Sequence, residues 1–342
     1  NAHYDMKLTL NDNEHKITGS EKITYVNNSP DLLEYLWIQL DQNVRAKNSD
    51  SYKISTGGIN SLSTRSIKRI FPTFDGGFNV TAVTDLDGND LSVAFNKTMM
   101  RINLQKPLKS GDIFSLKIDW WYNVNKRDEI GGRSGYEYFK KDDNNLYVIA
   151  QFFPRMCVYN DVEGWQNKQF LGSGEFTLPF GNYKVSITAP ANHVVAATGI
   201  LTNAKEVLSP LQLERLEESK SALEEPVFII NEKEAIKNEK SKVKNLKTWV
   251  YQAENVRDFG WASSKKFIWD VMTVKQSSKD VLAMSFYPKE GNPLWEQYST
   301  KAVAHTLKTY SKYTFDYPYP VAISIHSKDI GMEYPMICFN GG

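Results

Sequence analysis

One segment near the start of the chain reads Tyr4-Asp5-Met6-Lys7-Leu8-Thr9-Leu10, and it alternates apolar with polar side chains. This two-residue period is typical of a strand with one buried face. A turn follows, and a return strand is predicted at 17–26. Further strands are predicted at 36–40, 80–83, 91–95, 100–104 and 114–120, with 80–83 and 91–95 forming a hairpin around Asp87-Gly88. Short strands at this spacing indicate a large antiparallel sheet or sandwich.

The middle of the chain continues with strands and then becomes rich in charge. Strands are predicted at 147–158, 176–189, 194–197, 248–253 and 266–270. The charged residues 203–247 predict an insertion on the surface. It contains a helix that begins at Ser209-Pro210, because Ser accepts free N–H groups at a helix start and Pro is tolerated at the first helical position.

A second unit is predicted to begin near residue 276. It holds a strand at 281–287, a helix at 293–312, and a helix-ending Tyr317-Pro318-Tyr319-Pro320. Two strands at 321–326 and 336–339 lie on either side of a turn at Gly331-Met332-Glu333. We therefore expect a β-domain over residues 1–275 and a separate unit over 276–342.

The overall composition argues against several classes of partner. The 342 residues include 41 basic and 40 acidic side chains, a net charge of +1, which gives no argument for nucleic acid or a charged membrane surface. No apolar stretch approaches the ~20 residues that span a bilayer. The aromatic share of 13% favours strands. It also motivates a weaker alternative, a carbohydrate-binding sandwich.

The short segment Gly331-Met332-Glu333 carries most of the functional information. A carboxylate beside a strand edge can pair with an ammonium group through charge-assisted hydrogen bonds. The free N–H and C=O groups of that edge can bind an extended peptide as an additional strand. One carboxylate and one edge are therefore enough to select the amino terminus of a peptide. Taken alone, the three residues are more typical of a turn Gly and a solvated Glu, and it is their context in the chain that favours the functional interpretation.

Three ordered segments resemble the aminopeptidase N family of zinc metallopeptidases, in particular its bacterial members. Gly331-Met332-Glu333-Tyr334-Pro335-Met336-Ile337 is similar to the exopeptidase motif of the family. Gln151-Phe152-Phe153-Pro154-Arg155-Met156, followed by Tyr159-Asn160-Asp161, resembles its substrate-facing segment. Residues 254–262 resemble the strand that closes its first domain. The resemblance covers roughly residues 147–342.

The resemblance implies a mainly β fold. A large antiparallel β-sandwich, or saddle, would form the amino-terminal domain, followed by the opening α+β part of a thermolysin-like catalytic domain. Glu333 would capture the peptide amine at an edge that includes Gly331 and Met332, and Gln151 would assist. For Gln151 a second interpretation, a hydrogen-bonded Gln in an apolar strand, stays open because its spacing to Arg155 is off by one residue.

Two departures from the family pattern limit this interpretation. The common motif has Asn after Glu, whereas Tyr334 and Pro335 stand here, and Pro removes a backbone donor. The family binds zinc through His-Glu-x-x-His, which this sequence lacks. We therefore expect an amino-terminal part of a zinc aminopeptidase that binds peptide, binds no zinc itself and does not hydrolyse. A non-catalytic relative that binds peptides or proteins is the alternative, and the resemblance slightly favours an exported or periplasmic protein.

Overall fold

The structure of the chain is a computed structural model that describes residues 1–52, 74–172, 174, 176–328 and 330–341. The chain divides into two compact units. Unit 1 comprises residues 1–134, 151–185 and 254–258, and unit 2 comprises 135–150, 186–253 and 259–342. The expected boundary near residue 276 falls inside unit 2, and the division into 1–275 and 276–342 stays a prediction. Among the described residues, no helix has both the length and the hydropathy needed to cross a membrane.

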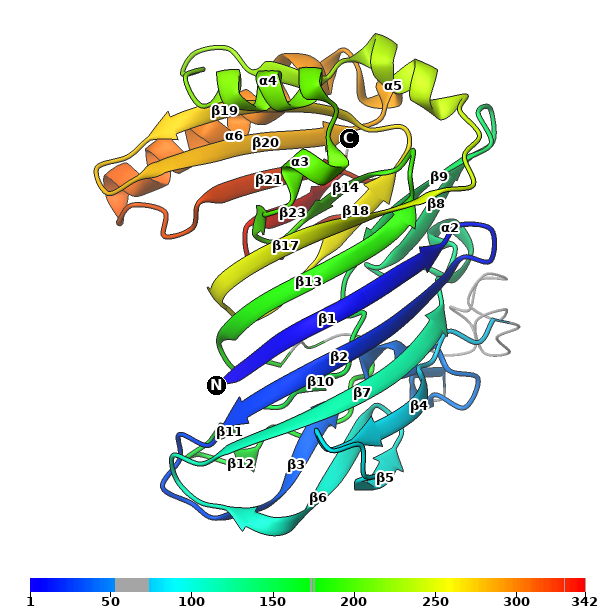
Figure 1. The fold of residues 1–342 in the computed structure, drawn as a ribbon, viewed down its shortest axis with the longest axis vertical. Coiled ribbons are helices and arrows are strands. Elements are labelled where there is room, and N and C mark those ends of the chain that lie inside the picture. The colour runs from blue at the N-terminus through cyan, green and yellow to red at the C-terminus, as the bar shows by residue number, and fades with distance from the viewer. Residues whose placement is uncertain (53–73, 173, 175, 329, 342) are drawn as a thin grey trace, which may run out of the picture. The chain divides into compact units, whose positions relative to one another are not determined.

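Unit 1 is built from antiparallel strands, as the alternating pattern predicted (Figure 1). Four strands are neighbours in the order β1 (Ala2–Asn11), β2 (Lys16–Val26), β7 (Ile113–Asn123) and β4 (Asn79–Thr84). A second sheet has the order β10 (Arg155–Met156), β3 (Leu33–Gln39), β6 (Met99–Leu108) and β5 (Ser92–Asn96). In β1 and β2 every second side chain is buried, because one face of the sheet packs into the core.

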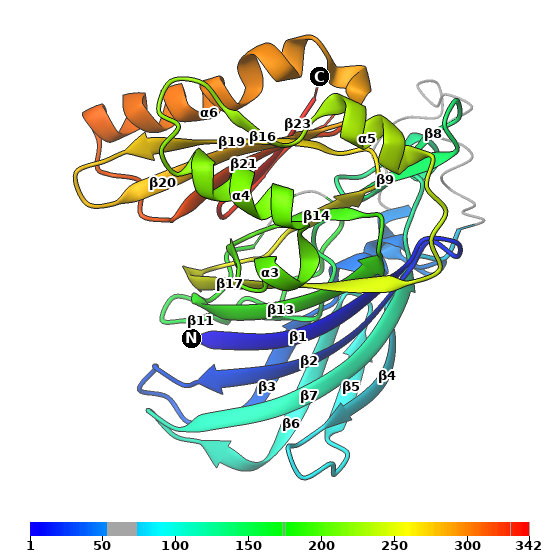
Figure 2. The ribbon, with the colours of Figure 1, turned by 45° about the horizontal axis from the view of Figure 1, so that its top comes forward.

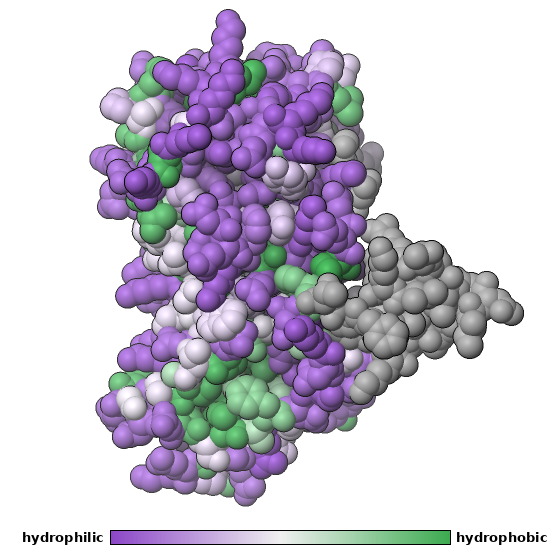
Figure 3. All heavy atoms as spheres, turned by 90° about the vertical axis from the view of Figure 1, so that its right-hand side faces the viewer, coloured by the Kyte–Doolittle hydropathy of each residue, from purple (hydrophilic) through white to green (hydrophobic). Residues whose placement is uncertain are grey.

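The predicted hairpin of 80–83 with 91–95 forms only at its turn end, where Thr84 bridges Asp90 and the Leu91 N–H donates to the Val83 carbonyl at 2.9 Å. The turn itself forms, since the Asp85 carboxylate accepts hydrogen bonds from the main chain of Asp87 and Asn89, both at 2.9 Å. However, β4 pairs with β7, and β5 pairs with β6 in the other sheet. Longer strands from elsewhere in the chain supply the pairing, which a local pattern does not specify. Figure 3 shows an apolar patch at the level of β4 and β5. Separately, Phe95 of β5 is 55% exposed.

Two sheets of the described residues lie entirely within unit 2. The smaller has the order β14 (Val194–Ala197), β18 (Trp261–Ser264), β9 (Asn144–Ile149) and β8 (Gly135–Phe139). The larger has the order β16 (Val227–Ile230), β19 (Ile268–Lys275), β20 (Asp280–Tyr287), β21 (Val321–His326), β23 (Ile337–Asn340) and β22 (Gly331–Tyr334). β20, β21 and β23 are parallel, and the other pairs in this sheet are antiparallel.

Helix α6 (Leu294–Tyr313) covers one face of the six-stranded sheet. It connects the parallel strands β20 and β21, the arrangement in which a helix packs back onto its sheet. Figure 2 shows α6 on one side of the sheet and α4 on the other. The shared core consists of Met272, Val274, Val281, Ala283, Ala304 and Leu307. The helix predicted at 293–312 is confirmed.

The charged stretch 203–247 is more than a surface insertion. It forms α3 (Ala204–Val207), α4 (Pro210–Ser219), β16 and α5 (Glu232–Glu239). Ser209 caps α4 as predicted. Its side-chain hydroxyl accepts a hydrogen bond from the main-chain N–H of Gln212, and the Gln212 side chain accepts one from the main-chain N–H of Ser209. β16 nevertheless pairs with β19 and so completes the larger sheet.

The remaining elements are short or cross the division between the units. β13 (Gly181–Pro190) and β17 (Leu246–Val256) contain residues of both units. The others are η1 (Asp41–Arg45), η2 (Asp50–Tyr52), α2 (Arg127–Ile130), β11 (Tyr159–Asn160), β12 (Gly164–Trp165), β15 (Ile200–Leu201) and η4 (Lys289–Gly291).

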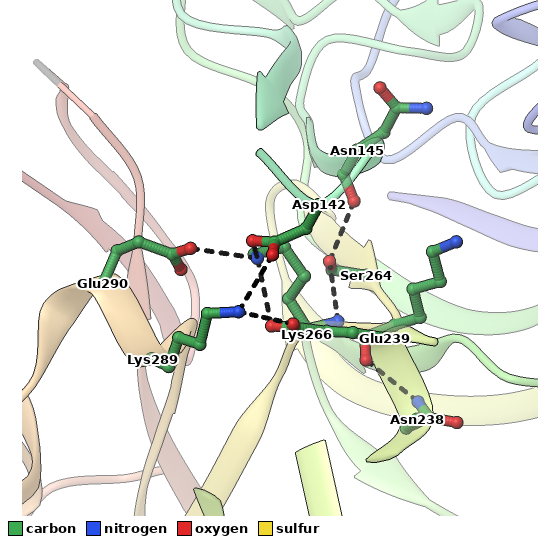
Figure 4. Close-up of polar contacts among 9 residues, drawn as sticks. Asp142, Asn145, Asn238, Glu239, Ser264, Lys266, Lys289 and Glu290 are labelled. Carbon is green, nitrogen blue, oxygen red and sulfur yellow. Dashed lines mark hydrogen bonds and ion pairs between the residues drawn. The ribbon is translucent and has the colours of Figure 1, made fainter. Parts of the chain in front are cut away.

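A buried cluster of charges joins four segments of unit 2 (Figure 4). The Lys266 ammonium group, whose side chain is 0% exposed, lies 2.6 Å from Asp142 and 3.0 Å from both Glu239 and Glu290. Lys289 pairs with the other oxygens of Asp142 and Glu239. The hydrogen bond from Lys266 is the main reason that the pKa of Asp142 falls to about 2. The cluster ties the β8–β9 turn to α5, to the β18–β19 turn and to η4.

Candidate functional site

The segment Gly331-Met332-Glu333 forms strand β22, where the sequence predicted a turn. The turn comes two residues later, at Pro335 and Met336, between β22 and β23. Met336 adopts φ 66°, and its carbonyl oxygen accepts a 2.8 Å hydrogen bond from the main chain of Ile323 on β21. Pro presets the first position of such a turn. Its missing donor therefore falls in the turn and leaves β22 intact.

Strand β22 is an edge of the six-stranded sheet. Tyr334 and Ile337 flank the two-residue turn, so they form a hydrogen-bonded pair and Glu333 with Cys338 forms the next, non-hydrogen-bonded pair. The main-chain N–H and C=O groups of Gly331 and Glu333 consequently point away from β23. Among the described residues, no strand lies on that side of β22. The edge is thus available for an additional strand.

The side chains of β22 alternate between water and the core. Glu333 and Gly331 are exposed, whereas Met332 is 4% exposed opposite Phe339. A Cβ atom added to Gly331 would meet nothing within 4 Å, so packing does not require glycine there. Burial, reinforced by the charge of Glu333, raises the pKa of the Cys338 thiol. The negative charge of Glu333 therefore lies at an open edge with space beside it.

The approach to β22 is held by a carboxylate that the sequence did not single out. Glu137 on β8 is 5% exposed and accepts hydrogen bonds from the Ser327 hydroxyl at 2.9 Å and the Lys328 main-chain N–H at 2.5 Å. These contacts join the smaller sheet to the residues that lead into the edge strand. Glu137 has no distinctive neighbours in sequence, so only the folded contacts reveal it.

Gln151 lies in unit 1, just after β9, and is 5% exposed. Its φ of 51° is in the left-handed region, which is uncommon for a residue with a Cβ atom and tends to occur at functional sites. Its carbonyl oxygen accepts a 2.9 Å hydrogen bond from the Gln42 amide. Gln151 and Glu333 belong to different units, so their joint action on one amine stays a prediction.

Arg155 has a structural role that the sequence did not indicate. It is 5% exposed, lies 2.9 Å from the Asp41 carboxylate and also pairs with Asp258. Asp258 belongs to the segment 254–262, so two of the segments that resemble the peptidase family are joined by this ion pair. Gly260 of the same segment lies beside the Tyr334 ring, which a Cβ atom there would approach to 3.4 Å, an ordinary van der Waals contact.

The five histidines are His3, His15, His193, His305 and His326. Of these, His193 and His326 are buried and His305 is exposed. His193 lies 2.9 Å from the Ser263 hydroxyl, and the exposed His305 lies 3.3 Å from that of Thr309. In the part of the chain that the structure describes, no group of three His, Cys, Asp or Glu side chains could hold a metal ion.

No protein-family model matches the sequence, and no curated protein matches it. Solved structures of an M1 zinc metallopeptidase from Deinococcus radiodurans are similar in fold. A mutant of that enzyme aligns with a TM-score of 0.59 and 14% identity, over 98% of this chain and 58% of that one. The enzyme without the mutation aligns with a TM-score of 0.58 and 14% identity, over 98% of this chain and 58% of that one. The mutant bound to a Tyr-Ser-Ala substrate aligns with a TM-score of 0.56 and 14% identity, over 98% of this chain and 59% of that one.

These comparisons show the fold. The chain spans 58–59% of the length of the three metallopeptidase structures. Its mainly β class, with several sheets, is confirmed. The chain therefore has the fold of part of an M1 zinc metallopeptidase.

Proposed function

We propose that this chain is the amino-terminal part of a zinc-dependent aminopeptidase and that it supplies the recognition surface for peptide amino termini. The observation that carries the proposal is the exposed Glu333 on the edge strand β22, beside main-chain groups that no described strand pairs with. The related fold of a zinc metallopeptidase bound to a Tyr-Ser-Ala substrate supports it.

The edge strand can recognise an amino terminus in two steps. An extended peptide pairs with the outward N–H and C=O groups of Gly331 and Glu333, which fixes its direction and register. The Glu333 carboxylate then binds the free ammonium group through a charge-assisted hydrogen bond. Gly331 leaves space for the peptide backbone, since no side chain occupies that point of the edge. The side-chain amide oxygen of Gln151, in unit 1, can also accept from an ammonium group, and its part in amine binding stays a prediction.

The zinc ion that the fold family implies has no ligand set among the described residues, so the proposal assigns no step to it. A zinc ion would supply an activated water for peptide hydrolysis when bound. The sequence contains no His-Glu-x-x-His, and we expect this chain alone not to hydrolyse an aminoacyl chromogenic substrate. Steady turnover of such a substrate by the purified chain would contradict this expectation.

The binding proposal is tested with two tripeptides, Tyr-Ser-Ala and its N-acetyl form, by chemical-shift titration of the isotope-labelled chain. We expect the free amine to bind more tightly and Glu333→Gln to weaken its binding about 10–100-fold, because charged hydrogen bonds contribute about 1.5–3 kcal/mol. Glu333→Gln should change the affinity for the acetylated peptide little.

A matched control uses Glu254→Gln, which removes an exposed carboxylate from strand β17. This variant should bind both peptides as the unchanged chain does. Equal binding of the free and acetylated peptides by the unchanged chain would overturn the proposed function.

A further inference from the structure

Unit 1 contains a cavity that takes no part in the proposed function. Its volume is about 550 Å³, which is within the ~300–1,000 Å³ of small-molecule sites. Every residue that lines it belongs to unit 1. The lining includes the end of β2 and the loop after it, β11, the residues before β13 and the residue after β17. Segments far apart in the sequence therefore form one hollow within a single unit.

Two tyrosine rings form an aromatic part of the wall, and a tryptophan packs against both. Tyr25, at the end of β2, is 5% exposed, and Tyr159 lies on β11. The Trp165 ring on β12 lies 5.2 Å from the Tyr159 ring and 6.0 Å from the Tyr25 ring, measured between ring centroids. Figure 1 shows β11 and β12 beside this end of β2. Because Trp165 does not line the cavity itself, it supports the two rings without filling the space.

The same wall carries a carboxylate in a fixed position. The Tyr159 hydroxyl donates to Asp31 Oδ2 at 2.7 Å, and both residues line the cavity. The hydrogen bond with Asp31 raises the pKa of Tyr159, so the hydroxyl stays protonated and continues to donate. Among the described residues, no group donates to the other oxygen, Asp31 Oδ1. That oxygen is therefore available to accept from a ligand.

A guanidinium group supplies donors to the cavity. Arg257 Nη1 donates to the Thr177 hydroxyl and, at 3.4 Å, to the Leu178 carbonyl oxygen. The guanidinium carbon lies 4.3 Å from the centre of the Phe180 ring, which is 38% exposed. All of these partners line the cavity, so the Arg257 head group lies at its wall. In the part of the chain that the structure describes, no carboxylate pairs with Arg257, and its Nε and Nη2 groups remain as donors.

The charges of the wall limit the class of ligand. The charged side chains that line the cavity are Asp31, Asp161 and Arg257, which carry both signs. A phosphate site concentrates donors, whereas the two carboxylates would repel an anion here. Arg257 would repel an organic cation, and no group of three His, Cys, Asp or Glu side chains among the described residues could hold a metal ion. The wall therefore favours a neutral ligand that both donates and accepts hydrogen bonds.

We propose that this cavity binds a neutral saccharide. A sugar ring has an apolar face of C–H groups, which can pack on the rings of Tyr159 and Phe180, and it has hydroxyl groups around its edge. A hydroxyl group both donates and accepts, so the sugar can donate to Asp31 Oδ1 and accept from Arg257. Aromatic rings and planar charged groups in one cavity thus match the two kinds of surface of a sugar. The proposal concerns unit 1 alone and does not depend on the peptide site at β22.

The test is chemical-shift titration of the isotope-labelled full chain with neutral disaccharides, namely maltose, cellobiose, lactose and N,N′-diacetylchitobiose. We expect at least one of them to shift the main-chain signals of Asp31, Tyr159 and Arg257 along a saturable curve. The zwitterionic peptide Tyr-Ser-Ala is the control ligand, and it should leave these signals unchanged.

A first pair of variants tests the aromatic contact. Phe180→Ala removes one partly exposed ring and should weaken binding of the disaccharide about 3–10-fold, because an aromatic contact is lost. Phe95→Ala is the matched control, since Phe95 is 55% exposed on β5 of the same unit and does not line the cavity. It should bind the disaccharide as the unchanged chain does.

A second pair tests the carboxylate. Asp31→Asn keeps the shape of the side chain and removes its charge, so binding should weaken about 3–10-fold, because hydrogen bonds to charged acceptors are stronger than neutral ones. Asp87→Asn makes the same change in the exposed turn between β4 and β5 and should leave the affinity as it is.

The saccharide site is overturned if none of the disaccharides shifts the signals of Asp31, Tyr159 and Arg257, or if the shifts lie only at residues outside the cavity. Equal affinities in both members of each variant pair would overturn it too. Shifts of these signals by Tyr-Ser-Ala alone would assign the cavity to a zwitterionic ligand instead. Peptide binding at β22 is read from the signals of Glu333 and Cys338, so the failure of either proposal is seen separately.

Discussion

Two carboxylates lie on the same transverse row of the six-stranded sheet and have opposite surroundings. From the interior to the edge, register partners in this row are Asp270, Ser285, Ser324, Cys338 and Glu333. Asp270 is 1% exposed beneath α6, where Tyr287 donates to it at 2.7 Å and Thr300 donates to its other oxygen. Glu333 is exposed on β22. Partners in a row share one face of the sheet.

The difference shows what the edge position contributes. The hydrogen-bonding capacity of Asp270 is used by neighbours that also exclude water, and burial raises its pKa to about 6. Such a carboxylate stabilises one arrangement of α6 on the sheet. Glu333 has the same chemistry without a covering helix, so its charge is available to a ligand. Burial, more than residue type, separates the structural carboxylate from the candidate for binding.

The largest loss of stability is expected where a buried and an exposed lysine near β19 are compared. Lys266→Met should lower the free energy of unfolding by about 3–5 kcal/mol, because it removes the buried cation that pairs with Asp142, Glu239 and Glu290 and leaves Lys289 to pair with the nearly buried Glu239. Lys275→Met, at the exposed end of β19, removes only a surface pair with Asp280 and should cost less than about 1 kcal/mol. Urea unfolding of both variants measures the difference, and similar losses would remove the distinction between buried and exposed charges.

The second prediction concerns pH and Asp270. The folded-state pKa of about 6 lies above the ~3.9 of an unfolded Asp, so the folded chain holds this proton more tightly. The resulting stabilisation is complete below about pH 4 and is lost as the pH rises through about 6, a change of roughly 2–3 kcal/mol. The charge of Glu296 on α6 adds to the effect of burial.

The measurement is urea unfolding between about pH 4 and pH 7. In Asp270→Asn this part of the pH dependence should vanish. A curve that keeps its slope in Asp270→Asn would show that another group is responsible.

A smaller loss is expected at the helix that covers Asp270. Thr300 donates to Asp270 and contacts the Ser285 hydroxyl at 2.7 Å. Thr300→Val keeps the shape and removes the hydroxyl, which should cost about 1–3 kcal/mol. Thr306→Val, on the exposed face of α6, should change stability by less than about 0.5 kcal/mol. Thermal unfolding compares the two, and an equal effect would argue against the packing of α6 on this row.

The smallest effect concerns Cys338, the direct neighbour of Glu333. Burial and then the charge of Glu333 raise the pKa of the Cys338 thiol. Glu333→Gln should lower that pKa and speed alkylation by iodoacetamide at mildly alkaline pH, without a change in stability. Cys157 is 0% exposed and should stay unreactive in the folded chain. An unchanged rate at Cys338 would place Glu333 away from the thiol and contradict the register of β22 with β23.

Local pattern was enough to predict much of the fold. The two-residue alternation at 4–10 and 17–26 produced β1 and β2, and the apolar spacing at 293–312 produced α6. The same pattern did not predict β7 as the main partner of 80–83, because a strand's periodicity indicates its faces and not its neighbour. The pattern also did not predict that 203–247 adds a strand to the larger sheet, because β16 is short and lies within charged sequence.

The sequence by itself determined the residue types of the candidate site, the carboxylate of Glu333, the glycine at 331 and the amide of Gln151. Only the tertiary structure decided that Gly331-Met332-Glu333 is an exposed edge strand and that the Gln42 amide donates to the Gln151 carbonyl oxygen from 109 positions away. It also decided that Asp270 is covered and Glu333 is not. The physical reason is that burial and hydrogen-bond partners depend on contacts between distant segments, which local periodicity does not encode.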